Sequence, residues 1–234
     1  MAATPKTTCG AAAGSVRPSP EPLKLWGEMA LLDARLHLAP GAPCAARAAT
    51  APGDEVVDRY AALVDGLVDK ASDLGLGQEA LHLAAALVDE HRRAAASGGF
   101  TSAPEDEELV ATACLKLADA FAEHSQEYFQ REKTAAYCAA RWRPEALLDA
   151  EKLVFHRVGA CLRRPTVAWF LRGCVHAGGA ELAHSPNVAQ LARFMVDLSL
   201  LDPEAKEHPA PLRAQAALLL AALCAAASAS PSGA

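Results

Sequence analysis

A ten-residue stretch in the middle of the chain limits the possible folds more than any other segment. Residues 109–118 read Leu-Val-Ala-Thr-Ala-Cys-Leu-Lys-Leu-Ala and lack the strand-like alternation of polar and apolar residues. A helix that is apolar on nearly every side has to be surrounded by other helices. The segment therefore predicts a helical core, and it makes its single charged residue, Lys116, unusual.

Apolar residues recur near the helical period on both sides of this stretch, and no segment alternates as a strand would. Glycine and proline mark helix ends, since Gly75 or Gly77 stops the helix that begins at Asp54, and Pro144 stands at a favoured first-turn position. The sequence therefore predicts an all-α fold. We expect helices over residues 54–74, 78–95, 105–122, 128–140, 144–162, 167–176, 187–201 and 212–227.

Composition divides the chain into four parts. Residues 1–53 are rich in alanine and proline, and we expect them to be mostly disordered, with helical spacing only at 23–38. Five predicted helices fill residues 54–163, and the remaining helices fill 164–227 after a break at Arg163-Arg164-Pro165-Thr166. Residues 228–234 form a predicted disordered tail.

The charge balance and the cysteines exclude some classes of partner and location. The chain has 22 Lys and Arg against 28 Asp and Glu, a net charge of −6, and no long basic run, so we expect no nucleic-acid partner. Its 7 cysteines include no Cys-x-x-Cys pair, which favours reduced thiols in the cytoplasm or nucleus. The most apolar segment, residues 214–227, falls short of a membrane span and predicts a buried helix, so we expect no membrane partner.

No motif for catalysis is present. The chain lacks a phosphate-binding glycine loop, a Gly-x-Ser-x-Gly turn and a His-Glu-x-x-His motif, and its 8 histidines are scattered. Cys138 with His124 or His156 would be a nucleophile and base, but nothing else supports such a pair. We therefore expect a protein that is not an enzyme and that carries no metal and no cofactor.

Two charged residues lie on helix faces that are otherwise apolar. One is Lys116, and the other is Glu151, which shares a face with Leu147, Val154 and Val158. Burying either charge alone costs several kcal/mol, as an order of magnitude. Each side chain must therefore extend to solvent, pair within the molecule, or face a binding surface.

Several segments resemble the cyclin family, in the order and spacing of that family. Residues 147–155, Leu-Leu-Asp-Ala-Glu-Lys-Leu-Val-Phe, resemble its Leu-x-Met-Glu-x-Leu-Val-Leu, and 164–171, Arg-Pro-Thr-Val-Ala-Trp-Phe-Leu, resemble its Pro-Thr-x-x-x-Phe-Leu. Residues 113–123 are similar to Ala-x-Leu-x-x-Ala-Ser-Lys-Tyr-Glu-Glu. Shorter similarities at 63–65, 86–89 and 194–202 complete the resemblance, the last to the segment between the two boxes of A- and B-type cyclins.

This resemblance implies a five-helix cyclin box over 54–163, followed by a partial second box. It implies a regulatory subunit that binds and activates a cyclin-dependent protein kinase in cell-cycle control, in the nucleus and cytoplasm, with kinase substrates as further partners. A different function is open to a cyclin-fold protein that has lost kinase activation and serves as a protein-interaction module. The sequence also leaves open a DNA-binding transcription factor of the same fold and an unrelated helical scaffold.

The resemblance assigns a kinase-binding surface. The glutamate of the family's kinase-binding surface falls on Glu151, whereas its lysine falls on Ala120. Lys116 lies one turn before Ala120 on the same helix face, and we expect it to substitute for that lysine. Leu148 and Phe121 would line the same surface.

The resemblance also assigns structural and substrate-docking positions. The family's buried aspartate falls on Asp89 and a core leucine on Leu109, while the arginine that pairs with the aspartate falls on Tyr60, beside Arg59. In the substrate-docking patch the family's tryptophan falls on Gly66 and its methionine on Arg59. The patch is therefore eroded, although Leu63 and Leu67 remain apolar.

Overall fold

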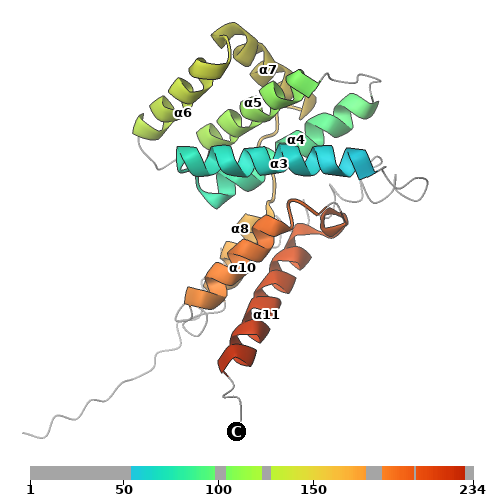
Figure 1. The fold of residues 1–234 in the computed structure, drawn as a ribbon, viewed down its shortest axis with the longest axis vertical. Helices are drawn as coiled ribbons and strands as arrows, with labels where there is room; N and C mark the ends of the chain where they lie inside the picture. The colour runs from blue at the N-terminus through green and yellow to red at the C-terminus, as the bar shows by residue number, and fades with distance from the viewer. Residues whose placement is uncertain (1–53, 98–103, 123–127, 178–185, 203, 230–234) are drawn as a thin grey trace, which may run out of the picture.

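The protein is described by a computed structural model that covers residues 54–97, 104–122, 128–177, 186–202 and 204–229 (Figure 1). The expected disorder of residues 1–53 and the expected helix at 23–38 lie outside these residues. So does most of the predicted tail, except that the last helix continues through residues 228 and 229, which the sequence pattern assigns to the tail.

Every regular element in the described ranges is helical, which confirms the predicted all-α fold. Five helices form the upper part of the molecule in Figure 1, and three form the lower part. The upper helices are α3 (Asp54–Leu74), α4 (Gln78–Ser97), α5 (Pro104–Ala122), α6 (Tyr128–Arg141) and α7 (Pro144–Arg157). The lower elements are α8 (Val167–Ala177), α10 (Pro186–Leu198), the single-turn η1 (Ala205–Glu207) and α11 (Ala210–Ala229).

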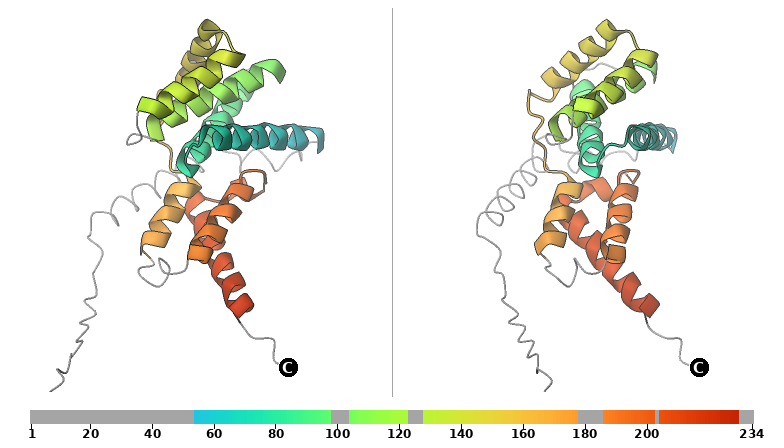
Figure 2. Two further views of the ribbon diagram at one scale, coloured as in Figure 1. Left: turned by 60° about the vertical axis from the view of Figure 1, so that its left-hand side comes forward. Right: turned by 90° about the vertical axis from the view of Figure 1, so that its left-hand side faces the viewer.

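The central helix of the upper part is α5, which contacts each of the other four helices there (Figures 1 and 2). Ala111, Ala113, Cys114 and Ala118 are fully buried along it. These small side chains allow close helix packing, while Leu115 and the leucines of α3 and α4 fill the volume between the helices. The prediction that residues 109–118 lie inside a helical core is confirmed.

A second and smaller core joins the three lower helices. Phe170 and Leu171 of α8 are fully buried against Val196 of α10 and against alanines of α11. Helix α8 starts where Thr166 Oγ1 accepts a hydrogen bond from the Trp169 amide at 3.1 Å, a side-chain cap of the helix N-terminus. The break expected around Thr166 is therefore the start of the second core.

Helix α7 ends five residues before its predicted end at residue 162. Its cap is Val158, and the next two residues have positive φ angles, 67° at Gly159 and 55° at Ala160. The Ala160 amide donates to the Phe155 carbonyl at 2.8 Å, and the Gly159 amide donates to the His156 carbonyl at 3.1 Å. These bonds satisfy the last carbonyls of the helix, so the glycine sets the end of α7.

Two expectations about the C-terminal helix are wrong. Residues Ala210–Ser228 are long and apolar enough to cross a membrane by length and composition, so the segment is not too short for a span. Nor is it a buried helix, since only 22% of that stretch is buried. The buried residues of its packed face are four alanines, Ala210, Ala214, Ala217 and Ala221, and Leu218 and Ala225 pack beside them partly buried.

The helix end at Gly159 yields a test with a matched control. We expect Gly159→Ala to lower the free energy of unfolding by about 1 kcal/mol, because a Cβ disfavours a φ of 67° although no atom lies within 4 Å of it. The same change at Gly66, inside α3 and also in open space, should raise stability by about 0.5–1 kcal/mol. Urea denaturation of both variants checks the pair, and equal signs would contradict this account of the end of α7.

Candidate functional site

Lys116 and Glu151 lie together where α5 packs against α7. The Lys116 ammonium donates to Glu151 Oε1 at 2.5 Å. The Lys116 side chain is 35% exposed and the Glu151 side chain 16%. Of the three expectations for these charges, pairing within the molecule therefore holds for both, and the pair still reaches the surface.

The surroundings of this pair are apolar and partly open. Leu148 is 49% exposed and Phe155 is 38% exposed on α7. On α5, Ala120 is exposed and Phe121 is half-buried against the first core. We call the surface formed by Lys116, Ala120, Phe121, Leu148, Glu151 and Phe155 the α5/α7 platform. Five of these residues are expected there from the sequence, and Phe155 is not.

Cys138 lies beneath this platform as a core residue. Its side chain is buried, and burial raises the pKa of the Cys138 thiol. A thiol of raised pKa is a poor nucleophile at neutral pH. His124 lies outside the described residues, and His156 is exposed on α7. No group of three or more His, Cys, Asp or Glu side chains in the described ranges is placed to hold a metal ion.

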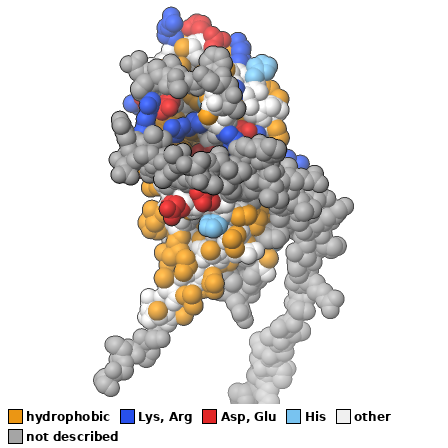
Figure 3. Space-filling view, turned by 90° about the vertical axis from the view of Figure 1, so that its right-hand side faces the viewer, with side chains coloured by type: hydrophobic (Ala, Val, Ile, Leu, Met, Phe, Trp, Pro, Cys, Tyr) orange, Lys and Arg blue, Asp and Glu red, His pale blue; other side chains and the backbone are white. Residues whose placement is uncertain are grey.

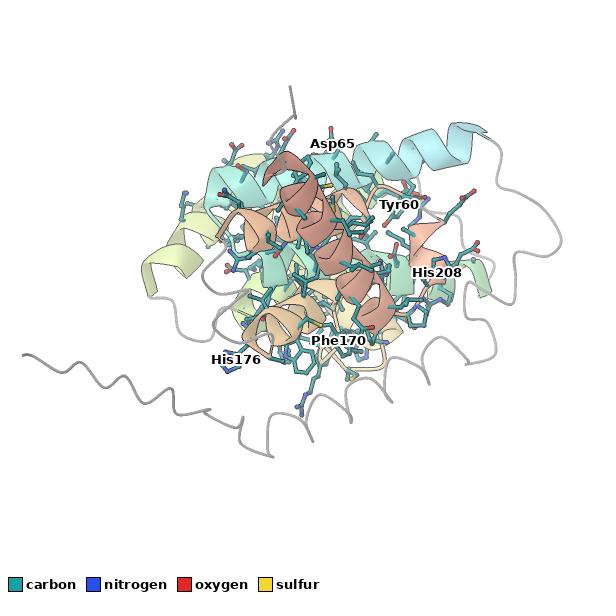
Figure 4. The ribbon with its side chains drawn as sticks, turned by 90° about the horizontal axis from the view of Figure 1, so that it is seen from below. Tyr60, Asp65, Phe170, His176 and His208 are labelled. Carbon is teal, nitrogen blue, oxygen red and sulfur yellow. The ribbon has the colours of Figure 1, made fainter. Side chains whose placement is uncertain are left out.

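Asp89 pairs with a residue of the lower part of the molecule. Lys206, in η1, places its ammonium 3.0 Å from Asp89 Oδ2 and 3.4 Å from Oδ1. The same ammonium lies 4.0 Å from the centre of the Tyr60 ring, so it also makes a cation–π contact. Seen from below, Tyr60 of α3 lies near the turn that carries His208 (Figure 4).

Lys206 thus pairs with the aspartate for which the resemblance implies an arginine partner. That arginine falls on Tyr60, and the expectation that neighbouring Arg59 belongs to the structural core is wrong. The Arg59 guanidinium lies 3.1 Å from Glu107 instead, and its side chain is 45% exposed. No sequence pattern points to Lys206, because it lies 117 residues from Asp89 along the chain. The expected core residue Leu109 is half-buried against the first core.

Burial disfavours both charges of this pair. It raises the pKa of the Asp89 carboxyl to about 7, although Arg92 and Arg93 lower that pKa in part. It also lowers the pKa of the Lys206 ammonium to about 7, helped by the nearby charge of Arg213. Each group therefore depends on the other to remain charged at neutral pH, and the Tyr60 ring further stabilises the Lys206 cation.

Further polar contacts of α4 extend this junction between the upper and lower parts. Gln78 donates to Asp197 Oδ1 at 2.7 Å, and His82 Nε2 lies 2.9 Å from the same oxygen. Burial lowers the pKa of His82 even though Asp197 opposes that shift. Arg172 of α8 lies 2.6 Å from Glu79. We call these contacts, together with the Asp89–Lys206 pair, the α4 junction.

The expected substrate-docking patch is a charged groove. Leu67 is fully buried and cannot line a surface, which corrects its assignment to the patch, whereas Leu63 and Gly66 do line the groove. The groove has a volume of about 570 Å³ between α3, α5 and α6. Its charged lining residues are Arg59, Asp69, Lys70, Asp73, Glu107, Glu108 and Arg141.

The Asp89–Lys206 pair yields a prediction with a pH dependence. In Lys206→Met the Asp89 carboxylate loses its partner, and we expect a loss of about 2 kcal/mol at pH 7, less than for a fully buried pair because 31% of the Asp89 side chain is exposed. The raised pKa of Asp89 means that the folded variant binds more protons than the unfolded chain between about pH 4 and 7. The loss should therefore shrink as the pH falls from 7 to 5.

Thermal or urea unfolding of wild type and Lys206→Met at pH 5 and pH 7 measures this difference. The matched control is Lys152→Met, whose ammonium lies 3.4 Å from Asp149 on the surface of α7 with both side chains exposed. An exposed pair of this kind contributes at most about 0.5 kcal/mol within a helix. A Lys206→Met variant as stable as this control at pH 7 would contradict the role assigned to Lys206.

Comparisons with known proteins support the fold, whereas the comparisons of sequence identify no family. No protein-family model and no curated protein matches the chain. Among solved structures it is similar to the X-ray structure of a viral cyclin from herpesvirus saimiri, with a TM-score of 0.64 over 84% of this chain and 80% of that chain. The two sequences are 11% identical over this match, so the similarity is one of fold. The chain therefore has the cyclin fold.

Proposed function

We propose that this chain is a cyclin-like regulatory subunit that binds a cyclin-dependent protein kinase through the α5/α7 platform and activates it in cell-cycle control. The observation that carries the proposal is the ion pair of Lys116 and Glu151, which is partly exposed on a cyclin fold. A location in the nucleus and cytoplasm belongs to the same proposal, as do kinase substrates among the partners.

The platform has the composition of a protein-binding surface. Leu148 and Phe155 expose apolar side chains next to one cation and one carboxylate. Interfaces commonly combine such an apolar centre with a few charged groups that set orientation. A complementary partner would therefore present an apolar patch, with hydrogen-bonding groups that bind the free donors and acceptors of the ion pair.

Lys116 supplies the cation that Ala120 lacks. Ala120 is exposed and has no polar group, whereas the Lys116 ammonium already lies at the surface beside Glu151. A kinase that covers the platform would remove water from both charges, which strengthens their attraction and their hydrogen bonds to the partner. The pair would therefore contribute most in the complex.

Activation follows if the platform binds one kinase arrangement better than the other. Phosphoryl transfer by a protein kinase requires an ion pair between a strand lysine and a glutamate of helix C. A partner that binds only the arrangement with this pair formed shifts the population toward it. A shift from 1:99 to 99:1 needs about 5.5 kcal/mol of differential binding. Since α5 is packed on several sides, the platform is rigid enough to discriminate in this way.

The second candidate function is a protein-interaction module of cyclin fold that binds without activating. The charged groove favours it, because a groove lined by ion pairs such as Lys70 with Glu108, at 3.1 Å, lacks the apolar character of a docking patch. A kinase assay with and without the purified chain discriminates the two functions. Binding without a rise in kinase activity would support the interaction module.

We expect Glu151→Ala to abolish co-purification with a cyclin-dependent kinase while leaving the helical content unchanged. The variant leaves the Lys116 ammonium without its partner, 35% exposed at the centre of the platform. Affinity purification followed by mass spectrometry measures the bound kinase, and circular dichroism checks the helices. A second variant, Leu148→Glu, places a charge at an exposed apolar position and should have the same effect.

Lys152→Ala is the matched control. This residue follows Glu151 on the same helix, but its side chain is 60% exposed and pairs with the exposed Asp149. It should bind the kinase as the wild type does. Unchanged binding in Glu151→Ala, with the helices intact, would count decisively against the proposed interface.

A further inference from the structure

One face of α11 is apolar and uncovered within the described part of the chain. Its packed face carries the four buried alanines against α8 and α10. On the opposite face Leu212, Leu219 and Leu223 are 51%, 62% and 57% exposed. Hydrophobic side chains gather over the lower half of the molecule on the side where α11 lies (Figure 3). Contiguous apolar patches on a protein surface often mark an interaction site.

The spacing of this face is that of a helix-pairing seam. Leu212, Ala216, Leu219 and Leu223 are separated by four, three and four residues, as in a coiled coil. Ala226 continues the pattern. Along one line of the helix the seam therefore reads Leu, Ala, Leu, Leu, Ala, and no charged residue occurs between Ala214 and Ser228. We call this line the α11 seam.

We propose that the α11 seam binds a second copy of this chain, with the two α11 helices antiparallel about a two-fold axis. A two-fold interface brings the same surface from both copies into contact, so the surface has to complement itself. In an antiparallel pair centred on Leu219, Leu212 of one helix would lie over Ala226 of the other, and Leu223 over Ala216. With no charge on the seam, self-pairing brings no like charges together.

The size of the seam predicts a weak dimer. A helix of 20 residues is about 30 Å long and about 10 Å wide, so one face covers on the order of 300 Å² in projection. Two such faces fall below the interface size of stable complexes, so the dimer should depend on concentration. The α5/α7 platform lies at the other end of the molecule and stays free, so this inference does not rest on the proposed function (Figure 1).

A lipid bilayer is the competing occupant, since Ala210–Ser228 is long and apolar enough to cross one. Crossing would separate Ala214 and Ala217 from α8 and α10, and would expose Phe170 and Val196 of the second core. Pairing of the seam leaves these contacts intact. The observations therefore favour a second copy of the chain.

Sedimentation equilibrium of the full chain over a dilution series tests the proposal. We expect the average mass to rise from 24.4 kDa toward twice that value as the concentration increases. The double variant Leu219→Glu with Leu223→Glu should remain monomeric at every concentration, with unchanged circular dichroism. Leu153→Glu is the control, because Leu153 is 43% exposed on α7, far from the seam, and this variant should still dimerise.

A charge-swap experiment provides the second measurement. The double variant Leu219→Lys with Leu223→Lys should also be monomeric alone, but mixed with the glutamate variant it should form a heterodimer, because opposite charges then face each other. Flotation with vesicles of phosphatidylcholine and phosphatidylserine measures membrane binding in parallel. A constant mass of 24.4 kDa for the wild type, a dimer that persists in the glutamate variant, or flotation of the wild type would overturn the proposal.

Discussion

Burial of α5 on several sides is the constraint on which the rest of the structure depends. Its alanines and Cys114 leave little side-chain volume, so α3, α4, α6 and α7 can approach it closely, and their leucines then fill the core. This packing has one consequence at the surface of the molecule. Lys116 is the residue of α5 that leaves this core beside α7, and Glu151 of α7 meets it there. The α5/α7 platform is therefore a product of core packing.

Helices α5 and α11 are similar in composition but differ in how many neighbouring helices cover them. Both are rich in alanine and leucine, and both have a proline in the first turn. Helix α5 has neighbours on several sides, whereas α11 contacts α8 and α10 with one face, whose fully buried residues are alanines. An apolar helix that is covered on one side has an unused face, and the leucines of α11 occupy that face.

Local pattern predicts most of the fold, because helix starts and apolar periodicity are encoded over short distances. Lys116 and Glu151 can be recognised in the sequence for the same reason, because each is a charged residue on an otherwise apolar helix face. The role of Lys206 cannot be predicted from the sequence, since only the tertiary approach of η1 to α4 brings it to Asp89.

The early end of α7 has a different origin. Gly159 is a stop signal in the sequence, but the helical spacing of Leu162 predicts a longer helix, and the backbone follows the glycine.

The α4 junction explains how a small second group of helices keeps a defined orientation on the first. Its contacts are polar, and the burial of Asp89, His82 and Lys206 is unfavourable unless each meets its partner. A rotation of the lower helices would leave these groups unpaired in a partly dry interface, at a cost in free energy that apolar contacts alone would not impose. Apolar packing tolerates sliding, whereas a contact of 3.0 Å between the Lys206 ammonium and the Asp89 carboxylate does not. The junction therefore determines orientation, and the two cores on either side of it supply most of the stability.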